Sequence, residues 1–132
     1  MSKAFTMAAA LVATLFLSTA MANDWPPLPA TGFITGRVAT AEEAATGKAF
    51  FCAMVNGAPA KSTPIKIKIP QYAYYHQGST KTQVIIMQAE TVQITQGSKT
   101  VTMSMVGARG PDGKGIIGLL ANFELLGTTP PK

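Results

Sequence analysis

Pro64-Ile65-Lys66-Ile67-Lys68-Ile69-Pro70 is the stretch that decides the fold class, because apolar and charged residues alternate along it with a period of two. Such alternation is typical of a strand with one face on a core and the other in water. We expect the isoleucines of this strand to be buried, its lysines to be exposed and its prolines to mark its two ends. The stretch therefore predicts a β protein.

Further strands are predicted on both sides, where short apolar or alternating runs lie between turn residues. They cover residues 33–39, 48–55, 72–76, 82–88, 92–95, 100–106 and 116–126. Turns are predicted at residues 56–59, 96–98 and 109–115. Seven or eight short strands with a turn about every 8–12 residues favour an all-β, mainly antiparallel fold, a small barrel or sandwich. The C-terminal half, with its Pro-Asp-Gly-Lys turn and Phe-Glu-Leu-Leu end, resembles SH3-like and OB-like small barrels.

One short helix is predicted at residues 41–46. Thr40 precedes it and Glu43 follows three residues later, which is the spacing of a capping box. Gly47 suits the C-terminal end of such a helix. We expect no second helix in the chain after the leader.

The leader is residues 1–22, which have the three parts of a secretory signal peptide. Lys3 is basic, residues 8–17 are small and apolar, and Ala20-Met21-Ala22 is a cleavage sequence. The apolar run is shorter than the ~20 residues that span a membrane, so no span is predicted. We expect cleavage near Ala22 and a periplasmic or secreted product.

The remaining chain divides into three parts. A proline-rich, extended lead-in (residues 23–31) is followed by one β domain (residues 32–127) and a flexible tail (residues 128–132). We expect Trp25 of the lead-in to cover one end of the domain.

Composition narrows the class of protein and of partner. The sequence is 47% hydrophobic, which excludes disorder, and its 12 glycines and 9 prolines exclude a helical bundle. Without Lys3, ten Lys and Arg face six Asp and Glu, and these cations are scattered. Outside the cytoplasm this charge favours an anionic envelope polymer or a partner protein, and no nucleic acid is expected. Cys52 is the only cysteine, so no disulfide can form within the chain, and we expect it to be a small buried hydrophobe.

Catalytic and metal-binding motifs are scarce. No nucleophile elbow, phosphate loop, dinucleotide fingerprint or zinc spacing occurs, so we expect no enzyme and no cofactor. A small hydrolase would need Glu90 and Glu124 to meet in one cleft. A periplasmic Cu(I)-binding protein is the other alternative, since Met103 and Met105 share one face of a predicted strand. Its further ligands would come from Met54, Met87, Cys52 and His76. The same alternation is ordinary in a half-buried strand, so no metal site is predicted.

The strongest binding candidate is a basic and aromatic segment in which all three tyrosines and the only histidine fall within five residues. The candidate binding residues are Lys66, Lys68, Tyr72, Tyr74, Tyr75, His76 and Lys81. On an extended chain Tyr72, Tyr74 and His76 share one face at a spacing of ~6.7 Å, which could stack sugar rings while the lysines bind acidic groups. Tyrosines that merely cover the domain surface are the alternative. We therefore expect a non-catalytic binding or accessory domain that acts on an anionic glycan or a partner protein.

Overall fold

The computed structural model describes residues 25–52, 54–55, 58–59 and 61–131. The predicted signal peptide lies outside these residues. Within them the mainly antiparallel β fold with one short α-helix is confirmed. None of the helices described is long and apolar enough to cross a membrane.

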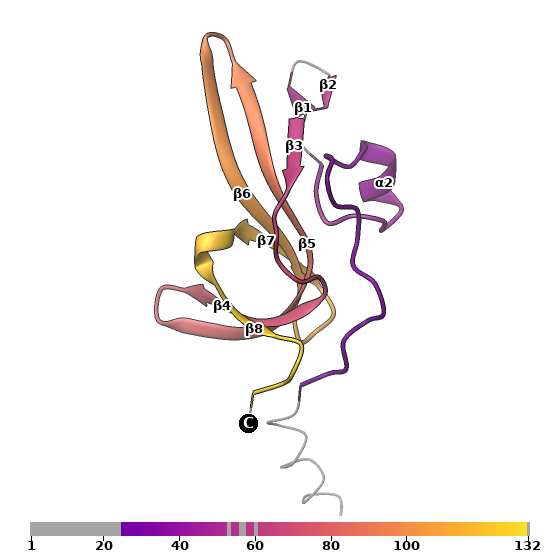
Figure 1. Ribbon diagram of the computed structural model, residues 1–132, viewed down its shortest axis with the longest axis vertical. Helices are drawn as coiled ribbons and strands as arrows, with labels where there is room; N and C mark the ends of the chain where they lie inside the picture. Colours follow the sequence, from indigo (N-terminus) through magenta and orange to yellow (C-terminus); the bar gives the residue numbers. More distant parts are fainter. Residues whose placement is uncertain (1–24, 53, 56–57, 60, 132) are drawn as a thin grey trace, which may run out of the picture.

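The main sheet has six strands and is open (Figure 1). The strands are β1 (Met54–Val55), β2 (Ala58–Pro59), β3 (Lys61–Pro64), β4 (Gln71–Gln77), β5 (Thr80–Gln96), β6 (Lys99–Arg109), β7 (Gly115–Leu119) and β8 (Phe123–Gly127). The helices are α2 (Ala41–Ala45) and the 3-10 helix η1 (Leu120–Asn122). The order in the sheet is β7-β6-β5-β4-β8, β3 also pairs with β5, and β1 and β2 form a separate pair. Along the described strands β7 and β8 do not pair, so the sheet is not closed.

β5 is the central strand, as its apolar residues 82–88 predict. Its one side pairs with β6, and its other side pairs first with β4 and then with β3. The prediction of a separate strand at residues 92–95 is wrong, because Ala89-Glu90-Thr91 contains no turn residue and β5 runs through it without a break.

A bulge at Met87 changes which side chains of β5 face each side of the sheet. The register with β6 shifts between Ile86 and Gln88. One face therefore carries Ile86 and then Ala89, while Gln88 and Glu90 turn to the opposite face. We call the face of Ile86 the inner face and the face of Glu90 the outer face.

The two faces are covered by different parts of the chain. The inner face holds a cluster of buried residues, namely Ala73, Val84, Ile86, Ala89, Val106, Ala108 and Phe123. The outer face is covered by the lead-in (here residues 25–31) and by residues 32–52, which we call the cover segment. In Figure 1 this indigo-to-purple chain runs along one side of the sheet.

The strands predicted at residues 33–39 and 48–55 are largely wrong. Of the described residues in these two ranges only Met54–Val55 forms a strand, and residues 33–39 have no regular structure. The cover segment crosses the outer face, where the Phe33 N–H donates to the Met87 carbonyl, instead of pairing along an edge of the sheet. The turn predicted at residues 56–59 lies partly outside the described residues, and Ala58–Pro59 is β2.

The stretch that indicated the fold class is itself mostly not a strand. β3 ends at Pro64, and residues 65–70 form the irregular connection from β3 to β4. They bend where the chain leaves β5 opposite Glu90 and rejoins it opposite Ile86. The expected sides are nonetheless observed, since the isoleucines are half-buried against the inner cluster and the lysines are exposed.

The capping box is confirmed. The Thr40 hydroxyl accepts from the Glu43 N–H, and the Glu43 carboxylate accepts from the Thr40 N–H, each at 3.1 Å. Arg37 also donates two hydrogen bonds to the Glu43 carboxylate, at 2.8 and 2.7 Å. These hydrogen bonds lower the pKa of Glu43 to about 2, and those from Arg37 have the largest effect. Gly47, at φ 77°, follows the helix.

Candidate functional site

Two of the predicted tyrosines are turned away from solvent. Tyr72 is only 3% exposed, and its hydroxyl donates to the Pro26 carbonyl at 2.8 Å. Tyr75 lies on the inner face, where its ring stacks on Phe123 at a centroid distance of 4.7 Å. The expected shelf therefore lacks Tyr72, because the lead-in covers it.

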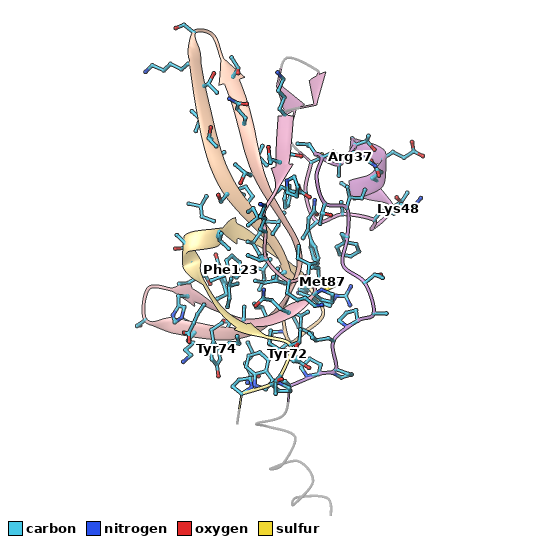
Figure 2. The ribbon with its side chains drawn as sticks, in the orientation of Figure 1. Arg37, Lys48, Tyr72, Tyr74, Met87 and Phe123 are labelled. Atoms are coloured by element: carbon cyan, nitrogen blue, oxygen red, sulfur yellow. The ribbon has the colours of Figure 1, made fainter. Side chains whose placement is uncertain are left out.

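The structure does bring Tyr74, His76 and Lys81 together, because His76 and Lys81 are paired across the β4–β5 hairpin. The Lys81 ammonium lies 4.0 Å from the centroid of the Tyr74 ring, and Trp25 packs edge-on against that ring at 5.2 Å. Trp25 thus covers this end of the domain, as the sequence indicated. The His76 Nε2 lies 3.0 Å from a carboxylate oxygen of Glu124, so an acidic group lies at this surface as well. Figure 2 shows Tyr72 and Tyr74 at this same end of the domain.

The other two predicted lysines belong to a different part of the molecule. Lys66 and Lys68 are exposed on the connection from β3 to β4, whose isoleucines pack on the inner cluster. The cation on the Tyr74 ring comes from Lys81 instead.

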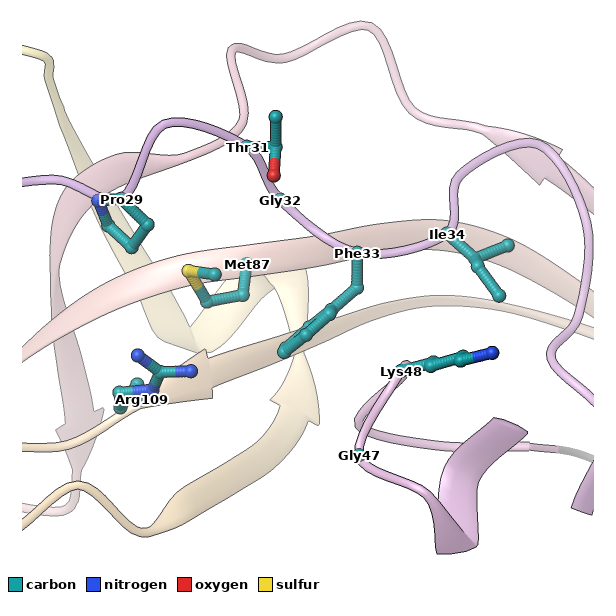
Figure 3. A pocket seen from close by; sticks show the side chains of 9 residues that line it. All are labelled: Pro29, Thr31, Gly32, Phe33, Ile34, Gly47, Lys48, Met87 and Arg109. Carbon is teal, nitrogen blue, oxygen red and sulfur yellow. The ribbon is translucent and has the colours of Figure 1, made fainter. Parts of the chain in front are cut away.

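A groove on the outer face is a candidate that sequence reasoning missed. It has a volume of about 510 Å³ and lies between the cover segment and the sheet (Figure 3). It is lined by Pro29, Thr31, Gly32, Phe33, Ile34, Gly47, Lys48, Met87 and Arg109. Pockets that bind small ligands have volumes of ~300–1,000 Å³ and mostly apolar walls with a few polar groups, which fits this set.

The bulge of β5 fixes the floor of the groove. The Met87 carbonyl accepts a hydrogen bond from the Phe33 N–H at 2.7 Å. Gly32, the residue before Phe33, lies so close to β5 that an added Cβ would be 2.7 Å from the Met87 carbonyl oxygen. Glycine is therefore required where the cover segment first meets the sheet.

Aromatic packing supports the floor from the side. The Phe33 and Phe50 rings meet edge-on at a centroid distance of 4.9 Å. Phe50 in turn lies against two glycines of the sheet, since an added Cβ would come within 2.5 Å of it at Gly107 and 2.8 Å at Gly115. The Phe33 ring therefore packs between Met87 of β5 and Phe50 of the cover segment.

The charged groups of the groove are both cations. In the view of Figure 3, Arg109 and Lys48 lie on opposite sides of the Phe33 ring. Among the lining residues that the structure describes, none is acidic. The acidic residue nearest to Lys48 in the sequence is Glu43, and its carboxylate forms an ion pair with Arg37. In the described part of the chain neither Lys48 nor Arg109 forms an ion pair, so both are free to bind an anion.

The alternative chemistries find little support in the geometry. Glu90 and Glu124 do not meet: Glu124 lies beside Tyr74, which pairs with Gln83, about seven residues or roughly 20 Å along β5 from Glu90. Among the described residues no group of three or more His, Cys, Asp or Glu is placed to hold a metal ion. Met105 and Cys52 pack against an apolar cluster on the outer face, and Cys52 is half-buried where the sequence predicted a buried residue.

Comparisons with family models, with curated proteins and with solved structures found no match for this chain. The functional argument therefore rests on the geometry of the two surfaces.

Proposed function

We propose that this chain is an exported, non-catalytic binding domain whose groove takes a segment of an anionic glycan. The observation that carries the proposal is the pair of cations, Lys48 and Arg109, on either side of the Phe33 ring in a groove whose described lining contains no acidic side chain. Carboxylates or sulfates on successive sugars would reach the two cations, while an apolar sugar face packs on Phe33.

The expected location supports this class of ligand. The signal peptide predicted at residues 1–22 directs the chain to the periplasm or the exterior, where acidic polymers of the envelope are abundant. Both cations are exposed, so the attraction is screened over ~8–10 Å at ordinary ionic strength and falls as salt rises.

The proposed scaffold is a small SH3-like or OB-like barrel. The path of the chain supports it, because β4 to β7 form a meander and η1 leads directly into β8, which pairs with β4. η1 contacts both β6 and β4, as it would in a sheet that curls toward closure.

The surface of Tyr74, His76 and Lys81 is the competing site. It keeps a cation on an aromatic ring, but Trp25 packs on that ring and Glu124 adds negative charge. Either surface would bind an acidic sugar oligomer, and substitutions can distinguish them.

The test is an NMR titration of the protein with trigalacturonate at low salt. Amide shifts should map to the groove, and Lys48→Ala or Arg109→Ala should each weaken binding about tenfold, which is ~1.4 kcal/mol. Lys66→Ala removes the same charge elsewhere and should leave the affinity within about twofold. Loss of binding in Tyr74→Ala and Lys81→Ala, with the groove variants unchanged, would move the site to the competing surface.

A further inference from the structure

The cover segment is held on the outer face by two buried side chains of β5. The Gly36 N–H donates to Oε2 of Glu90 at 2.8 Å, and the Phe50 N–H donates to Oε1 of Gln88 at 2.9 Å. Glu90 and Gln88 are both 0% exposed. These bonds join the sheet to both halves of the segment that carries Lys48.

Each of these side chains also has an unsatisfied atom. Oε1 of Glu90 and Nε2 of Gln88 are buried and have no hydrogen-bond partner. The surroundings of Glu90 are largely apolar, with Val38, Phe51 and Val92 in the adjoining cluster. Burial raises the pKa of Glu90 to about 6, against a smaller lowering by the Gly36 N–H.

No cation offsets a charge on Glu90. On the cover segment the neighbouring cation is Arg37, which is bound to Glu43, and the titratable group of the apolar cluster is the half-buried Cys52 thiol. On β3 the charged residue is the exposed Lys61, and on β6 the residue opposite Glu90 is Met105. The described residues therefore give Glu90 one hydrogen-bond donor and no ion pair.

We propose that protonation of Glu90 controls how firmly the cover segment docks on the outer face, and thereby the affinity of the groove between Lys48 and Arg109. The ligand in this inference rests on the proposed function, whereas the docking step does not. A neutral carboxyl group can stay buried and still accept from Gly36. An ionised one lacks a charge partner and favours opening of the cover segment to water.

The coupling follows from where the two cations sit. Lys48 belongs to the cover segment and Arg109 to the sheet, so opening separates them and removes the groove. Ligand affinity falls in proportion to the fraction of molecules in which the cover segment is docked.

The first test is amide hydrogen exchange in the ligand-free protein. Protection factors of Gly36 and Phe50, corrected for intrinsic exchange, should fall by up to about eightfold between pH 5 and pH 8, because opening returns the pKa of Glu90 from about 6 to its ordinary value of 4.5. Glu90→Gln should show no such fall at either amide. Equal profiles in both proteins would overturn the inference. A carbon NMR titration of Glu90 provides a check that needs no variant: a midpoint near 6 supports the inference, and one at or below 4.5 contradicts it.

The second test measures trigalacturonate affinity between pH 5 and pH 8, where its carboxylates stay ionised. Affinity should fall with rising pH in the wild type and stay level in Glu90→Gln, which still contains His76. A pH-dependent cover segment with a level affinity would overturn the coupling to the groove. Absence of binding at every pH would refute the proposed function, while the exchange data would still decide the docking step.

Discussion

The inner and outer faces of the sheet bury their side chains in different ways. Among the described residues, the inner face buries apolar side chains and Gln71, whose amide donates to the Lys68 carbonyl and accepts from the Gly127 N–H. The outer face buries Gln88 and Glu90 completely, although apolar side chains at these two positions would avoid the cost of desolvation. Their hydrogen bonds to Phe50 and Gly36 add direction to the apolar contacts of the cover segment.

The difference separates a face whose buried amide is fully hydrogen-bonded from a face that leaves two buried polar atoms without a partner. Directional bonds fix the place of the cover segment, and so the geometry of the groove, at the expense of two unsatisfied polar atoms beneath it.

The inner face should respond most strongly to truncation. Ile86→Ala removes a fully buried side chain and should lower the free energy of unfolding by roughly 2–5 kcal/mol. Ile67→Ala removes a half-buried side chain from the same face and should cost less. Urea unfolding measures both, and a change below about 1 kcal/mol for Ile86→Ala would contradict the assignment of the core.

An added side-chain atom should destabilise the outer face where Phe50 already packs closely on the sheet. Gly107→Ala would place a Cβ 2.5 Å from the Phe50 side chain, so Phe50 must move. We expect a loss of about 1–3 kcal/mol and a selective fall in the amide protection of the cover segment. Thr102→Ala, at an exposed site on the same strand, should stay within about 0.5 kcal/mol. If Gly107→Ala were neutral, the contact between Phe50 and the sheet would be wrong.

Stability should also depend on pH through Glu90. Its pKa is raised from 4.5 to about 6, so the folded state binds the proton more tightly than the unfolded state. The stabilising contribution is complete below pH 4.5 and is lost as the pH rises through about 6, by up to about 2 kcal/mol. Plots of the free energy of unfolding against pH should differ in slope between the wild type and Glu90→Gln over this window. Parallel curves would show that Glu90 ionises at an ordinary pH.

The smallest effect should come from the cap of α2. Thr40→Ala removes the hydroxyl that accepts from the Glu43 N–H and should cost about 1 kcal/mol. The loss should be confined to exchange near α2, because no residue of this helix is buried. Loss of protection in β5 would mean that the helix supports the sheet.

Local rules predicted the local features of this fold. The capping box, the central apolar run of β5 and the turn at Gly97 each depend on a few adjacent residues, and all three are observed. Residues 33–39 have the pattern of a strand, but they lie across the outer face instead of along an edge of the sheet, and no local pattern reveals which of these two positions a segment takes.

The candidate site was less predictable for the same reason. The bulge at Met87 decides which face Glu90 occupies, and its displaced carbonyl anchors the floor of the groove. Lys48 and Arg109 are distant in the sequence, and they line the same groove only because the cover segment crosses the sheet. The tyrosine cluster was visible in the sequence, but the sequence did not reveal that the lead-in covers Tyr72.

The most direct test of the central claim compares two double variants of equal net charge. Calorimetric titration with trigalacturonate at low salt would be run on Lys48→Ala/Arg109→Ala and on Lys66→Ala/Lys68→Ala. The account predicts that the first variant loses binding, by about a hundredfold or more if the two contributions add, while the second stays within a few-fold of the wild type. Equal losses in the two variants would show a non-specific attraction to positive charge, and the groove would not be the binding site.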